Sequence, residues 1–480
     1  MHERSAHQPA EDAAPATDRA PWTILVLLCV AQFMVILDVT VVNVALPSIR
    51  TTLHFAPQDL QWVVSAYVLM TGGLLLLGGR MADLVGRRRV FLTGLVVFTG
   101  ASLASGLAPS AATLIASRAA QGFGAALLSP AALSIITTIY RNEQRTTALS
   151  AWGAIGASGA AVGVLLGGVL TTWFGWRSVF FINVPVGLVA AALALRLVPA
   201  ARATLRSLLE LDLPGALTVV SGLAVLVYAL QGTTTQGWGS ARTLILLAIS
   251  GGLLAAFAAI ERGGRRPLVP SSIWHVRSLV SSAAVMLGTT GILVGTFFLN
   301  SLFLQNVLGA SALETGLAFL PLVVVIGIAA HVGPRLLMRV GARIVVIGGL
   351  ALIAAGDLLL SGAPAHAAYA TDLLPGFLLL GLGVGLTFVA ISVSAMSEIQ
   401  ADRAGFAAGL MTTGHELGAA FGVAIFSAVA LGSAVAGTAF IHGYSNGAMA
   451  GALIALVLAL FAAVAVPTFR PIAGHQITMH

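Results

Sequence analysis

GGRMADLVGRR, at residues 78–88, is the stretch that decides the fold, because a weaker copy, GPRLLMRVGAR, follows at residues 333–343. The two stretches align without gaps and share glycine, arginine, valine, glycine and arginine at their first, third, eighth, ninth and eleventh positions. Each copy follows the second apolar run in a series of six. The repeat therefore predicts two six-helix halves, at residues 22–198 and 279–466, built on one duplicated plan.

The composition indicates that lipid is the solvent of this chain. Of its 480 residues, 58% are hydrophobic and 9% are charged, whereas an ordinary soluble domain has roughly 45–50% and about 25%. So few charges cannot cover a water-soluble surface. Because a spanning helix needs about 20 apolar residues, the length is best interpreted as a count of membrane spans.

Fourteen apolar runs are expected to form the spanning helices. They lie at residues 22–46, 60–78, 90–108, 112–138, 148–172, 179–198, 213–232, 243–260, 279–303, 314–332, 343–361, 372–393, 404–430 and 447–466. The runs lack the two-residue alternation of strands and are about twice as long as the 9–11 residues of a barrel strand. We therefore predict an all-α membrane protein with 14 transmembrane helices, in which a linker at residues 199–278 carries two extra central helices.

The placement of arginine predicts the topology. The net charge is +7, and all 24 basic residues are arginines that lie between apolar runs, which argues against nucleic acid as a partner. With the N-terminus inside, twenty arginines are cytoplasmic and only Arg50, Arg177 and Arg242 lie outside. The positive-inside rule then places both termini in the cytoplasm of a multi-pass protein of the cell membrane, plasma or inner. The polar tails, at residues 1–21 and 467–480, are expected to be cytoplasmic, the first of them disordered.

Other kinds of chemistry leave no trace in the sequence. It has no phosphate-binding P-loop, no dinucleotide fingerprint and no Cys/His metal cluster. Its only cysteine, Cys29, cannot close an intramolecular disulfide. We therefore expect neither an enzyme nor a cofactor nor a bound metal, and an energy source other than ATP bound by this chain.

Four motifs carry a resemblance to a known family. They are LDVTVVNVALP at residues 37–47, GRMADLVGRRR at 79–89, RAAQGFGAA at 118–126 and WRSVFFINVP at 176–185. Together they make the chain resemble the fourteen-helix drug:proton antiporter branch of the major facilitator superfamily over nearly its whole length. The resemblance implies two halves that rock around a central cavity and export lipophilic or amphiphilic drugs, antibiotics or biocides, driven by the proton gradient. The implied partners are the small-molecule substrate, protons and the lipid bilayer, with no obligatory protein partner evident.

Two other functions stay open at this point. One is a proton-coupled importer of a small metabolite, because Val164 stands where the resembled antiporters have a proline in a glycine-rich stretch. The other is a membrane sensor that does not transport. A sensor is expected to have a sizeable soluble output domain, and no loop here is long enough for one.

Asp38 and Arg118 are the first candidates for proton coupling. Asp38 lies roughly 24 Å along its helix at 1.5 Å per residue, and Arg118 enters its own run by roughly 9 Å from the outside, so their depths allow an ion pair. Ionisable residues at such depth are functional hypotheses by default. A change in their separation would move Asp38 between protonated and ionised forms. A permanent polar pin between the two helices is the alternative.

His415 and Glu416 lie roughly 18 Å into the run at 404–430, near the bilayer midplane. Glu416 is the second candidate for proton coupling, with contact to a cationic substrate or a structural hydrogen bond as alternatives. His415 is a substrate-cavity candidate, although a lone histidine is more often a packed polar residue.

Asp357 lies about four residues from the outer end of the run at 343–361. We interpret it as an interfacial residue that water reaches.

The first copy of the repeat has a physical logic of its own. Its glycines permit a tight turn between antiparallel helices, and its single carboxylate faces a cluster of arginines. In the resembled family this loop is a cytoplasmic latch, which implies that role here for Gly79, Asp83, Gly86, Arg87 and Arg88. A plain topology anchor explains the arginines but neither Asp83 nor the paired glycines.

Two further sets of residues complete the prediction. Glycines at spacings of three and four are expected to lie on one face of the helix at 148–172 and to pack backbone to backbone, although nonspecific tight packing explains them equally well. These helix-packing glycines are Gly156, Gly159, Gly163, Gly167 and Gly168. Polar side chains in apolar runs are weak candidates for contact with substrate. They are Gln32, Asn43, Gln121, Asn300, Gln305 and His415.

Overall fold

Every regular element in the described part of the chain is helical. The computed structural model describes residues 22–56, 59–140, 142–199, 212–237, 239–263, 273, 275–399, 404–430 and 438–468. The first predicted tail, most of the second, and most of the linker outside its two helices lie outside these residues. The helices are α1 (Trp22–Leu53), α2 (Trp62–Val85), α3 (Arg87–Gly106), α4 (Ala111–Ile139), α5 (Asn142–Phe174), α6 (Ser178–Phe181), α7 (Asn183–Leu197), α8 (Leu213–Gln236), α9 (Ala241–Gly263), α10 (Arg277–Asn306), α11 (Ala312–Val340), α12 (Ala342–Ser361), the π-helical turn η3 (Tyr369–Leu373), α13 (Leu374–Met396), α14 (Ala404–Ala430) and α15 (Thr438–Ala465).

Twelve spans, and not the expected fourteen, are long and apolar enough to cross a membrane within the described residues. The two expected spans outside this set are α2 and α5, whose described apolar stretches, Trp62–Leu75 and Val162–Phe174, each border a residue whose side chain lies outside the described part. Both helices extend beyond these stretches into polar sequence, at the end of α2 and at the start of α5. The all-helical, multi-pass membrane fold is confirmed, and the count of fourteen is not supported.

Several helix boundaries differ from those predicted. α1 continues past Pro47 instead of ending before it. The single helix expected at 179–198 is divided into α6 and α7 at Ile182. α15 begins at Thr438, well before the predicted start, because its first turns contain polar residues that are buried inside the protein, such as Tyr444. Hydropathy alone cannot find a helix whose polar residues face a protein interior.

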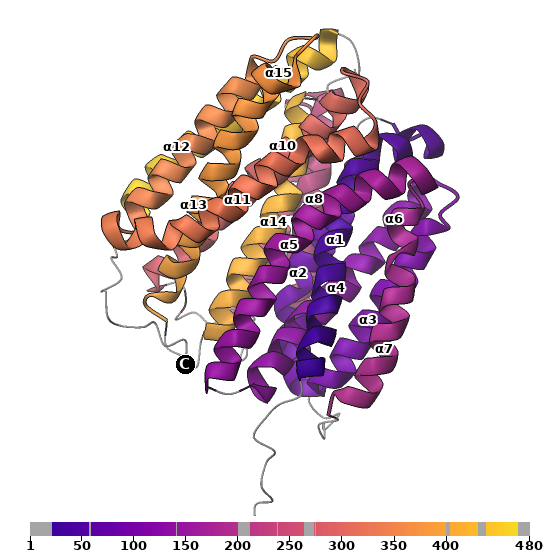
Figure 1. Ribbon diagram of the computed structural model, residues 1–480, viewed down its shortest axis with the longest axis vertical. Helices are drawn as coiled ribbons and strands as arrows, with labels where there is room; N and C mark the ends of the chain where they lie inside the picture. The colour runs from indigo at the N-terminus through magenta and orange to yellow at the C-terminus, as the bar shows by residue number, and fades with distance from the viewer. Residues whose placement is uncertain are drawn as a thin grey trace, which may run out of the picture.

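The two halves repeat one packing plan. In the N-terminal half α1 packs on α5, α4 packs on both α2 and α3, and α3 packs on α7. In the C-terminal half α10 packs on α14, α13 packs on both α11 and α12, and α12 packs on α15 in the same order. Figure 1 shows the indigo-to-magenta half and the orange-to-yellow half side by side, with α14 next to α2 and α11 in contact with α5. The extra helices α8 and α9 pack on each other, and α8 also contacts α2 and α14.

The two copies of the repeat end in the same turn. Gly86 separates α2 from α3 and Gly341 separates α11 from α12, each as a single non-helical residue. Their φ angles are 105° and 88°, a region that glycine enters without the steric cost of a β-carbon. The helices that follow, α3 and α12, both have 20 residues.

A seam of glycines joins α5 of one half to α11 of the other. A β-carbon at Gly168 would lie 2.8 Å from Cα of Leu313, and one at Gly316 would lie 2.7 Å from the carbonyl oxygen of Val164. These four residues define the α5–α11 seam, in which the two backbones are in direct contact. Small residues permit this close approach between membrane helices.

A second contact between the halves uses backbone carbonyls of α1. Proline at position 47 has no N–H, so the carbonyl of Asn43 loses the helical donor four residues ahead. Ser301 Oγ of α10 donates to this carbonyl at 3.1 Å, and Gln305 Nε2 donates to the carbonyl of Val44 at 3.1 Å. The residues Asn43, Val44, Ser301 and Gln305 define the α1–α10 seam. It lies at the end of the molecule where both α1 and α10 end.

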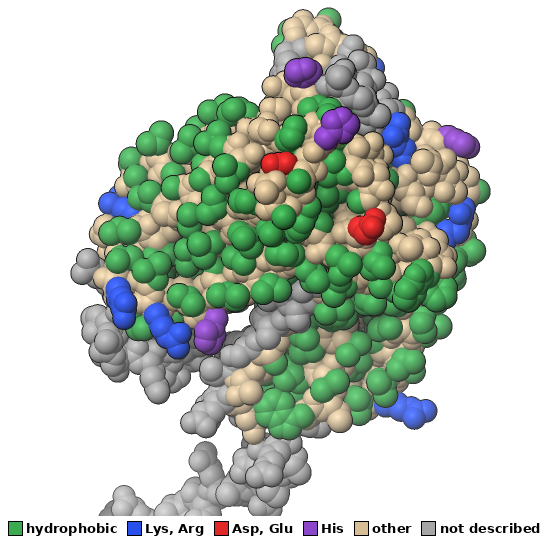
Figure 2. All heavy atoms as spheres, turned by 45° about the horizontal axis from the view of Figure 1, so that its top comes forward, with side chains coloured by type: hydrophobic (Ala, Val, Ile, Leu, Met, Phe, Trp, Pro, Cys, Tyr) green, Lys and Arg blue, Asp and Glu red, His purple; other side chains and the backbone are tan. Residues whose placement is uncertain are grey.

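The outer surface fits a lipid environment. Figure 2 shows a face covered largely by hydrophobic side chains, with arginines towards its periphery. Large apolar side chains are exposed on many helices, among them Trp173 and Phe174 of α5 and Leu460 and Val464 of α15. Apolar exposure on this scale is unfavourable in water and suits a bilayer.

Gly168→Ala is expected to weaken the α5–α11 seam. The added β-carbon would meet the backbone of α11, which cannot rotate away as a side chain would. Overpacking of this kind costs about 1–3 kcal/mol, so the thermal unfolding midpoint of the purified protein should fall. Gly348→Ala is the matched control, because nothing lies within 4 Å of its added β-carbon. Equal midpoints for the two variants would show that the seam contributes nothing to stability.

Candidate functional site

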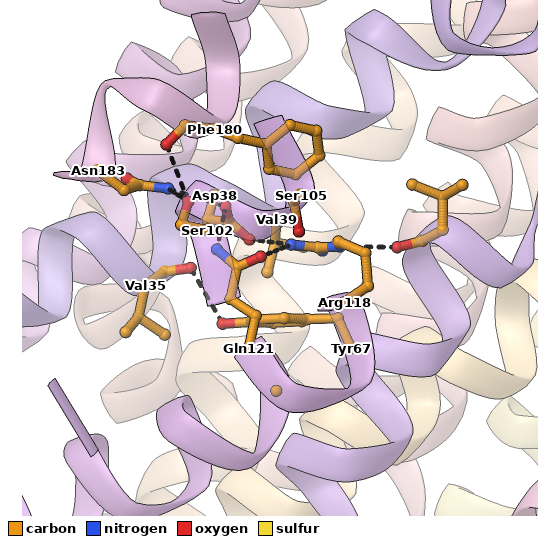
Figure 3. Close-up of polar contacts among 12 residues, drawn as sticks. Val35, Asp38, Val39, Tyr67, Ser102, Ser105, Arg118, Gln121, Phe180 and Asn183 are labelled. Carbon is orange, nitrogen blue, oxygen red and sulfur yellow. Dashed lines mark hydrogen bonds and ion pairs between the residues drawn. The ribbon is translucent and has the colours of Figure 1, made fainter. Parts of the chain in front are cut away.

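A fully buried carboxylate lies at the centre of the N-terminal half. Asp38 of α1 is paired with the guanidinium Nη1 of Arg118 of α4, and both side chains have an exposed fraction of 0%. Gln121 Nε2 donates to Asp38 Oδ1 at 2.8 Å, and Asn183 Nδ2 of α7 donates to the same oxygen at 3.0 Å. Figure 3 shows these side chains converging from three helices. The ion pair that the sequence allowed is thus present in the structure.

Arg118 is held on several sides. Its Nε donates to the carbonyl of Val63 in α2 at 2.8 Å, and its Nη1 also donates to Gln121 Oε1 at 2.8 Å. Its Cζ lies 4.3 Å from the centre of the Tyr67 ring and 5.8 Å from that of Phe180, within the range of cation–π attraction. Its Nη2 is buried and has no hydrogen-bond partner among the described residues. One donor of this cation therefore stays free.

The network continues from Asp38 towards α3 and α6. Asn183 Nδ2 also donates to Ser102 Oγ at 3.1 Å, and Ser102 Oγ donates to the carbonyl of Phe180 at 2.9 Å. Nearby, Ser105 Oγ donates to Ser117 Oγ at 2.9 Å. The hydroxyl and amide groups thus link α3, α6 and α7 to the carboxylate.

Local sequence explains this convergence. Arg118 and Gln121 are three residues apart on α4, so they lie on one face of the helix. Asn183 is the first residue of α7, and the short α6 before it brings the carbonyl of Phe180 into reach of Ser102. A buried charge is tolerated when it is paired and hydrogen-bonded, and Asp38 meets both conditions.

At this site the carboxyl of Asp38 can either form an ion pair with Arg118 or bind a proton. While Arg118 is in contact, the negative charge of Asp38 is balanced, and a proton on Asp38 would leave the buried guanidinium unbalanced. Movement of α4 relative to α1 would reverse that preference. The geometry therefore ties the charge balance of Asp38 to its contact with Arg118.

The other acidic candidate lies on a contact between the two halves. Glu416 is half-buried on α14, and a β-carbon at Gly72 of α2 would lie 2.8 Å from Glu416 Cβ. His415 Nδ1 is hydrogen-bonded to the hydroxyl of Thr290 at 3.0 Å. Tyr67 of α2 is within electrostatic range of both Asp38 and Glu416. The two predicted proton carriers thus flank one buried tyrosine.

The side chains of four of the six cavity candidates form hydrogen bonds with residues of their own half. Gln32 is half-buried and accepts a hydrogen bond from Ser129 at 2.9 Å, and Gln121 belongs to the Asp38 network. Asn300 is buried and accepts from the hydroxyl of Tyr444 at 2.8 Å. His415 bonds to α10, as described above.

The other two cavity candidates, Asn43 and Gln305, belong to the α1–α10 seam. Asn43 contributes its backbone carbonyl to that seam, while its side-chain amide donates to the carbonyl of Val39 in its own helix at 2.9 Å. Contact of any of the six with a substrate stays a prediction.

The residues of the predicted latch are described only in part. The side chain of Asp83 lies outside the described part, and so do the surroundings of Gly156, one of the predicted packing glycines. Arg88 Nη2 donates to the carbonyl of Leu195 in α7 at 2.5 Å, which ties the turn at Gly86 to the neighbouring helix. The latch therefore stays a prediction for Gly79, Asp83, Gly86, Arg87 and Arg88.

The predicted packing glycines lie against two helices. Added β-carbons at Gly159, Gly163 and Gly167 would meet Ile36, Thr40 and Val41 of α1 within 1.8–3.1 Å. Gly168 faces α11 instead. α5 thus contacts α1 of its own half through one face of glycines, and it contacts α11 of the opposite half through Gly168.

Sequence reasoning missed three members of the buried network, Tyr67, Ser102 and Asn183. Asn183 stands within the WRSVFFINVP motif, which was the available signal, whereas Ser102 gave none.

The interpretation of Asp357 as interfacial was wrong, because its exposed fraction is 0%. It lies near the end of α12, but α15 packs over it.

Comparison with known proteins identifies the fold family. The model of the Major Facilitator Superfamily matches residues 28–423. The chain belongs to this family. It is accordingly a membrane transporter of small molecules and not an enzyme.

Relatives in the Major Facilitator Superfamily cover nearly the whole chain. The cephamycin export protein of Amycolatopsis lactamdurans is 41% identical over 87% of this chain and 86% of its own length. The puromycin resistance protein of Streptomyces alboniger is 40% identical over 94% and 91%. A solved bacterial homologue of the human lysosomal transporter Spinster, inward-facing and unoccupied, superimposes with a TM-score of 0.66 at 15% identity, over 95% of this chain and 98% of that one. The last comparison shows the shared fold.

Arg118→Met is expected to destabilise the protein more than the double variant Asp38→Asn/Arg118→Met. Loss of one partner leaves the other charge buried without compensation, at a cost of about 3–5 kcal/mol in known buried pairs. Neutralising Asp38 as well removes that charge. Thermal midpoints of the wild type, both single variants and the double variant measure the coupling. A double variant no more stable than Arg118→Met would mean that the two groups are not held as an ion pair.

Proposed function

We propose that this Major Facilitator Superfamily transporter exports lipophilic or amphiphilic small molecules, antibiotics among them, in exchange for protons. The observation that carries the proposal is the buried ion pair of Asp38 and Arg118. A structural pin needs no charges, since uncharged residues can pack at this depth without the same desolvation penalty. The names of the relatives, which state cephamycin export and puromycin resistance, support the direction and the substrate class.

The proposal includes fourteen spans and a cytoplasmic location for both termini. The twelve long apolar helices are joined by α2 and α5, which are 24 and 33 residues long. Their polar sections are expected to lie where protein surrounds them or where they leave the bilayer. The arginine distribution supports this orientation in the plasma or inner membrane.

In this orientation the halves are in contact at their outer ends, as expected for an inward-facing state. The α1–α10 seam lies at the end where both helices end, which is then the outer side. Opening this seam while the cytoplasmic ends close would present the central region to the outside. Rocking of this kind is a general way for duplicated halves to alternate access.

The proposed coupling follows from the balance of charge. When Asp38 takes up a proton from outside, its ion pair with Arg118 is lost, and α4 can shift relative to α1. Return of Arg118 to Asp38 expels the proton into the cytoplasm. The gradient, and neither ATP nor a bound cofactor, then supplies the energy.

Half-buried polar residues are the proposed points of substrate contact. Gln32 lies on α1, while His415 and Glu416 lie on α14 of the other half. A substrate between the halves would meet both helices at once. The carboxyl of Glu416 could bind a cationic group of the substrate. The apolar side chains of the helices could contact the apolar part of an amphiphilic substrate.

Asp38→Asn is expected to abolish proton-driven export. The amide keeps the size and hydrogen-bonding capacity of the carboxyl but cannot titrate. Sensitive cells that express the protein would be exposed to a panel of antibiotics and dyes, with intracellular accumulation measured with and without a protonophore. The wild type should lower accumulation unless the gradient is collapsed, and the variant should not lower it at all.

Asp372→Asn, a change of the same kind on η3, is the control and should export like the wild type. Raised accumulation in wild-type cells would favour the importer. Undiminished efflux by Asp38→Asn would remove this residue from the coupling and transfer the role to Glu416.

Asp83→Asn is expected to impair export far more than Arg89→Gln. In the proposed latch Asp83 is the only anion of the loop, whereas Arg89 is one of three consecutive arginines. Initial efflux rates at matched expression compare the two variants. Equal and mild effects would reduce the loop to a topology anchor.

A further inference from the structure

A second carboxyl is buried in the C-terminal half. Asp357 of α12 has an exposed fraction of 0%. Its Oδ1 accepts a hydrogen bond from Thr296 Oγ1 of α10 at 3.2 Å, while its Oδ2 has no hydrogen-bond partner among the described residues. A β-carbon at Gly451 of α15 would lie 2.4 Å from Oδ2, so this glycine provides the room for the carboxyl. Three helices therefore enclose one acidic group.

No cation balances this carboxyl within the described residues. Tyr444 of α15 is the titratable group within its electrostatic range, and α13 has no titratable residue at all. The other titratable or charged residues on the elements around it make no hydrogen bond or ion pair with Asp357. They are Arg277 of α10, Glu314, His331, Arg335 and Arg339 of α11, Arg343 of α12, Tyr369 and Asp372 of η3, and His415 and Glu416 of α14, with His442 of α15.

The contrast with Asp38 fixes the charge of Asp357 in this conformation. Asp38 has an arginine and two amide donors, whereas Asp357 has one hydroxyl donor. An ionised carboxylate with so few partners is strongly disfavoured away from water. This environment therefore favours the neutral, protonated form of Asp357 in this conformation.

Its position in the repeat relates Asp357 to the Asp38 network. Asp357 lies 15 residues after Ala342, the first residue of α12, and Ser102 lies 15 residues after Arg87, the first residue of α3. Ser102 is the residue through which α3 joins the network around Asp38. In each half the third helix thus places a polar group against the last helix of that half, and Asp357 also accepts a hydrogen bond from the first.

The carboxyl is also connected to the contact between the halves. Thr296, its hydroxyl partner, accepts at its backbone carbonyl a hydrogen bond from Asn300 Nδ2 at 2.9 Å. The next residue, Ser301, donates to α1 in the α1–α10 seam. A shift of α10 within its own half as the seam opens would therefore disturb the contact of Thr296 with Asp357.

We propose that Asp357 is a second proton-binding site of the transporter, which binds its proton when the α1–α10 seam is open to the outside, holds it as the seam closes, and releases it on the cytoplasmic side before the seam opens again. The proposal rests on the proton coupling proposed above. It gives each half one carboxyl that titrates in the cycle, with Thr296 as its positioning residue. The ligand is the proton itself.

Infrared difference spectroscopy on the full-length protein in lipid nanodiscs tests the resting state directly. The wild type should show the C=O band of a protonated carboxylic acid at neutral pH, and Asp357→Asn and Asp357→Ser should lose part of it. The serine variant restores the residue type found at Ser102, which guards against loss of folding. Asp372→Asn is the control and should keep the band. An unchanged band in both Asp357 variants would overturn the proposal.

Transport in proteoliposomes then separates an exchanging proton from a permanent one. For Asp357→Asn we expect gradient-driven export of an antibiotic to fall about tenfold or more, while substrate exchange without a gradient stays within about twofold of the wild type. Thr296→Val should shift the pH dependence of export without abolishing it. Wild-type export and proton release per substrate in Asp357→Asn would mean a fixed structural proton and would refute the site.

Failure of the proposed function is distinguishable from failure of this site. If the wild type shows no gradient-dependent transport of any compound, the coupling fails for the whole protein. In that case a pH-dependent loss of the infrared band in the wild type, absent in Asp357→Ser, still supports an exchangeable proton at Asp357, and its absence refutes one.

Discussion

The pairing of Asp38 with Arg118 constrains the whole N-terminal half. A carboxylate and a guanidinium with no exposure to solvent are stable only while they remain in contact and keep their hydrogen bonds. Meeting that condition fixes α1, α4 and α7 relative to one another, and it requires the break at Ile182 that lets Asn183 begin α7. The C-terminal half has no such pair in its described part. It encloses a single carboxyl, so the two halves share a fold and differ in how their buried charge is balanced.

Much of the architecture could be predicted because membrane spans and duplication leave strong signals. A run of apolar residues has few alternatives to a helix in lipid, and the glycines at 86 and 341 mark the same turn in both halves. Asp38 and Arg118 stood out for the same reason, since a charge inside an apolar run has to be paired. Depth along two helices was enough to match them.

The remaining features depend on packing between helices, which hydropathy does not encode. The described apolar stretches of α2 and α5 are shorter than a full span, and α15 began early because its first polar residues face protein. Asp357 was misplaced for a related reason: its distance from a helix end suggested water, but the neighbouring Gly451 allows α15 to cover it. Ser102 and Asn183 are ordinary polar residues whose importance comes only from the carboxylate that they reach.

The α1–α10 seam has an evolutionary consequence. On the α1 side it uses the carbonyls of Asn43 and Val44, which are present whatever the side chains at these positions are. Mutation can therefore alter the side chains of this part of α1 while the hydrogen bonds across the seam persist, provided that Pro47 keeps the first carbonyl free. A lineage can thus diversify in what its members recognise without having to reinvent the closure that each of them shares.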